Sequence, residues 1–136
     1  KTFGRHLHQH GTVAEWIALS RMEIDQARLL VLRTAWMIDR HGAKGAAKEI
    51  AMIKALVPRV QDAVCNRAMQ TFGAMGLSPD TPLSELWTWG RVLRIADGPD
   101  EVHLQNVARQ EMKQARDHFG ASARFMRAPE YDAEID

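Results

Sequence analysis

The sequence contains a single cysteine, almost no net charge and no long hydrophobic run. Cys65 cannot form an intrachain disulfide, and its place in an apolar helical pattern favours a buried, inert thiol and a reducing compartment. The sequence has eighteen basic and seventeen acidic residues, and its arginines are scattered. It therefore shows no cluster of basic residues that would bind nucleic acid. The longest apolar runs, 29–32 and 35–38, are far shorter than the about 20 residues of a membrane span. We therefore expect one soluble domain with a core, no nucleic acid and no membrane span.

Apolar residues recur at intervals of three, four and seven positions along most of the chain, and no convincing strand, internal repeat or low-complexity segment appears. Gly42 and Gly45 indicate a break after a long first helix, and the glycines and prolines within 73–83 indicate an irregular loop. The sequence predicts an all-α fold, an up-down helical bundle of two long and two shorter helices within residues 1–125. The acidic tail, 126–136, is expected to be mobile. The expected helices span 12–41, 46–72, 84–95 and 99–119.

An acidic turn separates the last two expected helices. Gly98 permits backbone angles that are closed to other residues, and Pro99 suits the first position of a helix. Asp100 and Glu101 favour the positive end of the helix dipole. The preceding Asp97 would be fixed by rigid structure on both sides, and taken alone it fits an N-cap as well as a functional carboxylate.

Two further motifs accompany this turn. The second long helix ends in Gln70-Thr71-Phe72-Gly73-Ala74-Met75-Gly76, which alone indicates only a helix C-terminus with glycine stops. The chain opens with Lys1-Thr2-Phe3-Gly4, without an initiating Met or an apolar leader, so we expect it to begin within a larger protein.

Together and in this order, the three motifs resemble the C-terminal helical domain of acyl-CoA dehydrogenases, flavoproteins that desaturate acyl-CoA thioesters. The resemblance extends from Lys1 to about Met112. The sequence of residues 97–104, Asp-Gly-Pro-Asp-Glu-Val-His-Leu, is most similar to the branch of acyl-CoA dehydrogenases that contains family members 10 and 11. The family's opening segment has an Arg before the Lys, and this chain lacks it.

The resemblance implies that Asp97 is the catalytic base, since the family carries its base, usually a glutamate, in this loop. Asp97 would remove a proton from the acyl α-carbon while a hydride leaves the β-carbon for flavin N5. Gly98 would lie in the substrate-binding region around the thioester. Aspartate shortens the reach by roughly 1.5 Å, so either the backbone approaches the substrate more closely or the base lies elsewhere. Some members do place their base on an earlier helix, which this chain does not contain.

The resemblance also implies an FAD cofactor held by two subunits. Backbone amides at the start of the last helix suit an electron-rich ligand, and a glycine lets a backbone approach a cofactor closely. Ala74 stands where many relatives have glycine, so the approach there is expected to be looser. The residues expected on the flavin of the same subunit are Pro99, Asp100 and Glu101. Those expected on the adenine and pyrophosphate end of the neighbouring subunit's FAD are Gln70, Thr71, Phe72, Gly73 and Ala74, with Thr2 and Phe3.

The implied partners are an acyl-CoA substrate, a homodimer or homotetramer formed through this domain, and an electron-transferring flavoprotein. An acyl-CoA oxidase, which passes electrons to oxygen, would share these residues. The implied location is the cytoplasm in a bacterium and otherwise the mitochondrial matrix. Family members also have an N-terminal helical domain and a middle β-domain, so this chain alone is expected to be inactive. The alternative is a non-catalytic helical module for oligomerisation or partner binding, with Asp97 as a cap.

Several other residues are expected to be structural. His6, His8 and His10 alternate, but they run into a helix without a fourth ligand nearby, so we expect no metal site. Trp87 is expected in the core and Trp89 at a helix or subunit contact. Arg109 is expected to form a buried or interfacial ion pair.

Overall fold

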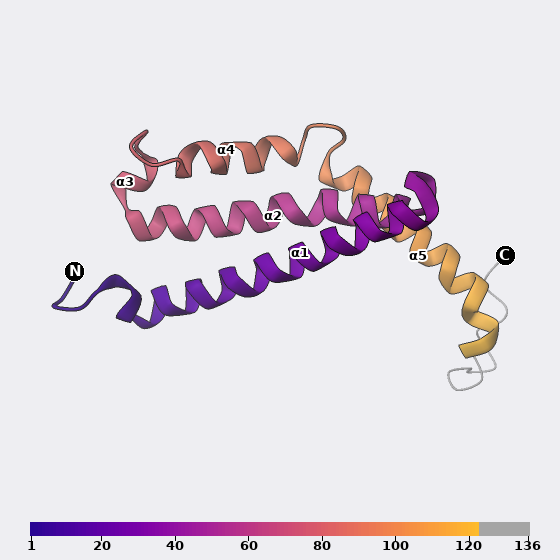
Figure 1. Ribbon diagram of the computed structural model, residues 1–136, viewed down its shortest axis with the longest axis horizontal. Coiled ribbons are helices and arrows are strands. Elements are labelled where there is room, and N and C mark those ends of the chain that lie inside the picture. The colour runs from indigo at the N-terminus through magenta and orange to yellow at the C-terminus, as the bar shows by residue number, and fades with distance from the viewer. Residues whose placement is uncertain (123–136) are drawn as a thin grey trace.

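The computed structural model describes residues 1–122 of the chain, with side chains through Arg116, and this part is helical (Figure 1). The all-α class is therefore confirmed. The expected tail, 126–136, lies outside the described residues. The elements in chain order are the 3-10 turn η1 (Leu7–Gln9) and the helices α1 (Gly11–Gly45), α2 (Ala47–Phe72), α3 (Ala74–Leu77), α4 (Leu83–Leu93) and α5 (Asp100–Ser122).

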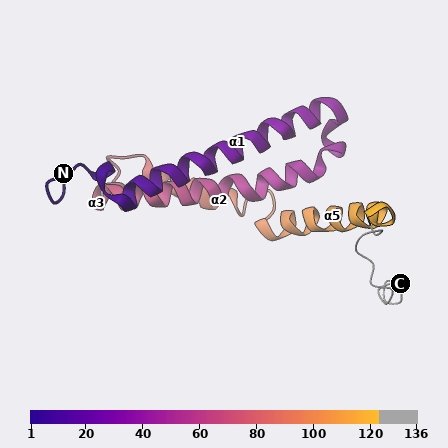
Figure 2. The same ribbon diagram turned by 90° about the horizontal axis from the view of Figure 1, so that it is seen from below.

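Helix α2 is the platform on which the other elements pack. It lies between α1 and α4 in Figure 1, and its first half lies between α1 and α5 in Figure 2. Helix α4 follows the C-terminal half of α2, where Gln61 Nε2 donates a 2.7 Å hydrogen bond to the carbonyl of Leu86. Helix α5 follows the N-terminal half, where Lys48 pairs with Glu111 at 2.7 Å, and then runs past the end of the α1–α2 hairpin. The connection from α4 to α5 therefore lies over the middle of α2.

The break expected at Gly42 and Gly45 is a kink inside α1. Gly42 has φ 68° and ψ 171°, a backbone conformation that interrupts the helix and that glycine adopts without a side-chain clash. One further turn then leads into α2. The sequence thus located the hairpin correctly.

The irregular loop expected over 73–83 is wrong in part, because α3 forms a helical turn within it. Gly73, with φ 61° and ψ −138°, ends α2 and starts this turn. Gly76 is buried so tightly against α2 that an added Cβ would lie 2.7 Å from the Cα and the carbonyl oxygen of Met69. The glycine that indicated a loop instead permits close packing of a short helix.

Small side chains form the buried apolar core between the helices. Cys65 is among them, which confirms its expected burial. Burial raises the pKa of its thiol, and the negative charge of Asp62 adds to the rise, so the thiol stays protonated and unreactive. The other buried apolar residues with described side chains include Ala27, Ala46, Ala51, Ala55 and Pro58.

Many large apolar side chains are exposed instead. Trp87, expected in the core, is 41% exposed because α4 packs on α2 along one side only. Trp89 is exposed as well. None of the helices in the described part of the chain is both long and apolar enough to cross a bilayer.

Candidate active site

The connection between α4 and α5 contains two consecutive residues with left-handed backbone angles. Asp97 has φ 54° and Gly98 has φ 99°. Aspartate tolerates this region better than most residues, but the conformation remains strained and persists only where the surroundings hold it. The turn closes when the amide of Asp100 donates a 3.1 Å hydrogen bond to the carbonyl of Arg94. The chain thereby passes from α4 to α5 in a short turn that contains Asp97, and both helices run antiparallel to α2 (Figure 1).

Asp97 is an exposed residue and is among those that line an apolar groove of about 480 Å³. Within the described residues its carboxylate makes no hydrogen bond or ion pair, so it does not cap α5. A free carboxylate beside an apolar wall is the arrangement that a general base requires. The groove is lined by Ile50, Ile53, Lys54, Val57, Pro58, Leu93, Asp97 and His103.

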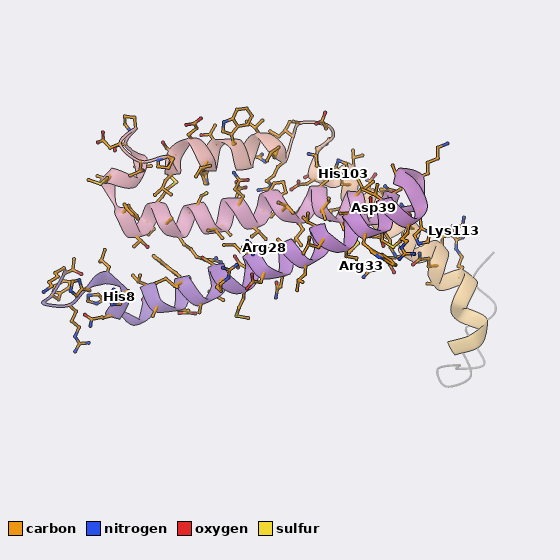
Figure 3. All side chains as sticks on the ribbon, viewed as in Figure 1. His8, Arg28, Arg33, Asp39, His103 and Lys113 are labelled. Carbon is orange, nitrogen blue, oxygen red and sulfur yellow. The ribbon has the colours of Figure 1, made fainter. Side chains whose placement is uncertain are left out.

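Two side chains from other helices hold the backbone of this turn. Lys54 on α2 donates hydrogen bonds from Nζ to the carbonyls of Leu93, at 2.5 Å, and Ala96, at 2.6 Å. His103 lies on the first turn of α5, next to the connection from α4 (Figure 3), and its Nε2 donates to the carbonyl of Asp97 at 3.2 Å. These bonds satisfy carbonyls that the end of a helix leaves without partners.

A buried ion-pair network ties the same turn to α2. Asp100 is only 3% exposed, and its Oδ2 accepts hydrogen bonds from Arg94 Nε at 2.8 Å and Arg59 Nε at 3.0 Å. Arg94 also donates from Nη1 to Asp62 at 3.1 Å. Burial disfavours the charged form of Asp100, but the hydrogen bonds from Arg94 and then Arg59 outweigh it and hold its pKa below the ordinary value. The bonds from Asp100 and Asp62 raise the pKa of Arg94.

This network was not predicted. We expected Asp100 among the flavin contacts at the start of the last helix, and that stays a prediction; its carboxylate pairs with Arg59 and Arg94. Gly90 makes room for the network, since an added Cβ there would lie 2.5 Å from Oδ1 of Asp62. The pairing depends on how α4 and α5 pack on α2, which no local pattern in the sequence reports.

The glycine motif and the chain start lie at the other end of the bundle. Figure 1 shows the N-terminus and α3 at one end, away from the α4–α5 connection. Phe3 is 99% exposed, and Phe72 is exposed beside Gly73, where an added Cβ would meet nothing within 4 Å. The Thr71 hydroxyl is used inside α2, donating to the carbonyl of Arg67 at 2.8 Å. The structure thus separates the predicted residues into two groups, one around Asp97 and one around Gly73.

Comparison with known proteins identifies the family. The family model "Acyl-CoA dehydrogenase, C-terminal domain" matches residues 1–112. The chain belongs to this family. Acyl-CoA dehydrogenase family member 10 of Mus musculus is 54% identical over 82% of the chain and 10% of its own length. Family member 11 of Homo sapiens is 47% identical over 82% of the chain and 14% of its own length. The expected similarity to members 10 and 11 is therefore confirmed.

Solved structures agree with this placement. A structure described as an acyl-CoA dehydrogenase from Mycobacterium abscessus superposes with a TM-score of 0.82 and 44% identity, over 84% of this chain and 28% of that one. An FAD complex of PigA superposes with a TM-score of 0.75 and 25% identity, over 81% of this chain and 28% of that one. A probable acyl-CoA dehydrogenase of Mycobacterium tuberculosis is 53% identical over 88% of this chain. The chain spans less than a third of the length of these relatives.

Other residues of this acyl-CoA dehydrogenase domain lie outside both groups. His6 and His8 stack at 5.7 Å between ring centroids, while His10 shares a 3.2 Å hydrogen bond with the hydroxyl of Thr2. In the part of the chain that the structure describes, no three His, Cys, Asp or Glu side chains are grouped to hold a metal ion. Arg109 is exposed and forms no ion pair among the described residues, so a buried ion pair is wrong, while an interfacial one stays a prediction.

Proposed function

We propose that the protein containing this chain is an FAD-dependent acyl-CoA dehydrogenase that desaturates an acyl-CoA thioester between its α- and β-carbons. Asp97 is the α-proton base. One observation carries this assignment: Asp97 lies in a strained turn and lines an apolar groove, and its carboxylate has no partner among the described residues. Strained residues that the surroundings fix in place are concentrated at functional sites.

Asp97 supplies the proton chemistry. Its carboxylate accepts the α-proton of the acyl group, and Ile53 and Val57 give the groove beside it an apolar wall. Gly98 lies beside the thioester in this proposal, and its missing side chain leaves room for the ring of His103, whose Nε2 would lie 3.1 Å from an added Cβ. FAD, when bound, accepts the hydride that leaves the β-carbon.

Two parts of the chain are suited to contact FAD, the group around Gly73 and the start of α5. Gly73 is open to an approaching ligand, since nothing lies within 4 Å of the position that a Cβ would occupy. The group around Gly73 contacts the adenine and pyrophosphate end of the neighbouring subunit's FAD. Its members are Gln70, Thr71, Phe72, Gly73 and Ala74, with Thr2 and Phe3.

On the flavin of the same subunit, the contacts come from Pro99, Asp100 and Glu101. Pro99 and Glu101 are exposed, and the carboxylate of Asp100 fixes this segment through its two arginine pairs. The separation of the Asp97 and Gly73 groups in Figure 1 favours two different flavins, one for each group.

The assembly is a homodimer or homotetramer, and electrons leave to an electron-transferring flavoprotein. The location is the cytoplasm if the source is bacterial and otherwise the mitochondrial matrix. The exposed apolar side chains of α1 support self-association, because a monomer rarely leaves a large apolar face in water. The same side chains also suit the alternative, a non-catalytic module for oligomerisation or partner binding.

The variant Asp97→Asn in the full-length protein separates these functions. The amide keeps the size of the side chain and removes the base, so the rate at which acyl-CoA bleaches the flavin without oxygen should fall by about 10²–10⁴-fold. FAD content and the thermal midpoint are the controls. Undiminished bleaching by a normally folded variant rejects Asp97 as the base, and wild-type protein without FAD supports the module.

A further inference from the structure

We propose that Lys54 is the positioning residue that sets the reach of Asp97. This inference rests on the proposed function, because it concerns the geometry of the same base. Asp97 is one methylene shorter than a glutamate would be, so its backbone must lie closer to the substrate. A misplacement of about 1 Å can reduce a rate by about a hundredfold. The turn therefore needs an anchor outside its own residues.

The contacts of Lys54 place it as that anchor. Its side chain lies along the apolar groove, and its ammonium reaches the carbonyls of Leu93 and Ala96 at 2.5 and 2.6 Å. Both are carbonyls at or just past the C-terminal end of α4, where a positive charge is favoured by the helix dipole. One lysine thus links the last turn of α4 to the residue directly before Asp97.

The bond to Ala96 acts on the conformation of Asp97 itself. The carbonyl of Ala96 belongs to the peptide plane on the N-terminal side of Asp97, and the carbonyl of Asp97 belongs to the plane on its C-terminal side. Lys54 holds the first plane and His103 the second, at 3.2 Å. Fixing both planes fixes the two soft dihedral angles of the residue between them. The left-handed φ of 54° at Asp97 is therefore held from two helices, α2 and α5.

Lys54 acts on the backbone and not on the carboxylate. Both of its hydrogen bonds go to carbonyl oxygens, and among the described residues it forms no ion pair. A role limited to joining helices would be shared by Lys48, which also lies on α2 and bonds to Glu111 and Gln114 of α5 at 2.7 and 2.8 Å. Lys48 lies away from the turn and is the matched control.

The test uses the full-length flavoprotein and follows flavin bleaching by acyl-CoA in single turnovers without oxygen. Lys54→Met keeps the apolar stem and removes the ammonium, so the rate per bound FAD should fall by about 100-fold, with little change in the substrate concentration at half saturation. Lys54→Arg keeps donors and charge and should recover part of the rate. Lys48→Met should leave the rate per bound FAD unchanged.

The double variant Lys54→Met with Asp97→Asn separates this inference from the proposed function. If Lys54 acts through Asp97, the double variant should be no slower than Asp97→Asn alone. Equal slowing in both backgrounds, or an unchanged rate in Lys54→Met, overturns the positioning role while Asp97 remains the base. An unchanged rate in Asp97→Asn overturns the base itself. If Lys54→Met fails to retain FAD, Lys54→Gln carries the test, and a wild-type rate in that variant also overturns the role.

Discussion

At the residue scale, the molecule uses glycine and aspartate where other residues would not fit. Asp97 and Gly98 adopt left-handed angles in the short turn that joins α4 to α5. Gly76 has another role, since its missing side chain lets α3 rest directly on the backbone of Met69. Backbone atoms cannot move aside as the end of a flexible side chain can, so this contact tolerates no added atom.

Gly76→Ala should therefore destabilise the full-length protein. Its Cβ would lie 2.7 Å from two backbone atoms of Met69, and overpacking of this kind costs about 1–3 kcal/mol in the free energy of unfolding. Urea unfolding followed by circular dichroism measures the change. The matched control is Gly11→Ala at the start of α1, where an added Cβ meets nothing within 4 Å. A loss equal in the two variants would contradict the close packing of α3.

At the element scale, α2 determines where the site lies. It carries Lys54, Arg59 and Asp62, which together bind the end of α4 and the start of α5. The carboxylate of Asp100 is the centre of this attachment, and it is buried and ionised at neutral pH because two arginines hold it. The stability of the α4–α5 connection is thereby linked to pH.

The sign of this linkage follows from the lowered pKa of Asp100. A carboxyl group whose pKa is lower in the folded state stabilises the fold above its unfolded pKa, near 3.9, and the stabilisation is lost as pH falls through the folded value. Asp100→Asn should reduce the free energy of unfolding at pH 7 by about 1.5–3 kcal/mol. The difference from wild type should shrink below about pH 4.

Urea unfolding of both proteins between pH 7 and pH 3 measures this difference. Glu111→Gln is the control, because that carboxylate is largely exposed and its pair with Lys48 is expected to contribute about 0–1 kcal/mol. A difference between Asp100→Asn and wild type that stays constant down to pH 3 would contradict the linkage.

The sequence predicted the helices well because their signal is local. The apolar periodicity of 12–41 and 46–72 closely matches α1 and α2, and glycines mark the kink near the end of α1. It missed α3, because a helical turn of four residues depends on how Gly76 packs against α2. It also missed the pair of Arg59 with Asp100, which lie 41 positions apart and meet only after α5 packs on α2.

The candidate site was predicted only in part. Asp97 was predicted because the acidic turn resembles a family motif; in the structure it lines an apolar groove, and its role as the base stays a prediction. Lys54 and His103 were not found, since nothing in the sequence shows which backbone carbonyls need a partner. Residues that act on the backbone of a turn leave no spacing pattern, so only the packed structure shows them.

At the scale of the whole molecule, the most prominent feature is an uncovered apolar face on α1. Leu29, Leu32 and Trp36 are spaced by three and four positions, so they lie on one side of the helix, and they are 67%, 59% and 53% exposed. Covering each leucine would contribute about 1.5–3 kcal/mol. We expect a second copy of the protein, or another domain of the same polypeptide, to cover this face.

Leu32→Glu in the full-length protein tests the self-association that we propose. In an interface between identical copies each substitution occurs twice, so a buried charge should weaken the assembly at least tenfold and shift it to smaller species in light scattering. Because the proposed FAD site takes residues around Gly73 from the neighbouring subunit, dissociation should also release FAD. Lys44→Glu, a charge change on α1 outside this face, should leave both mass and FAD content unchanged. If the Leu32→Glu protein forms smaller species but keeps its full FAD content, one subunit holds the cofactor alone. If it keeps the wild-type mass, this face is covered from within the same polypeptide.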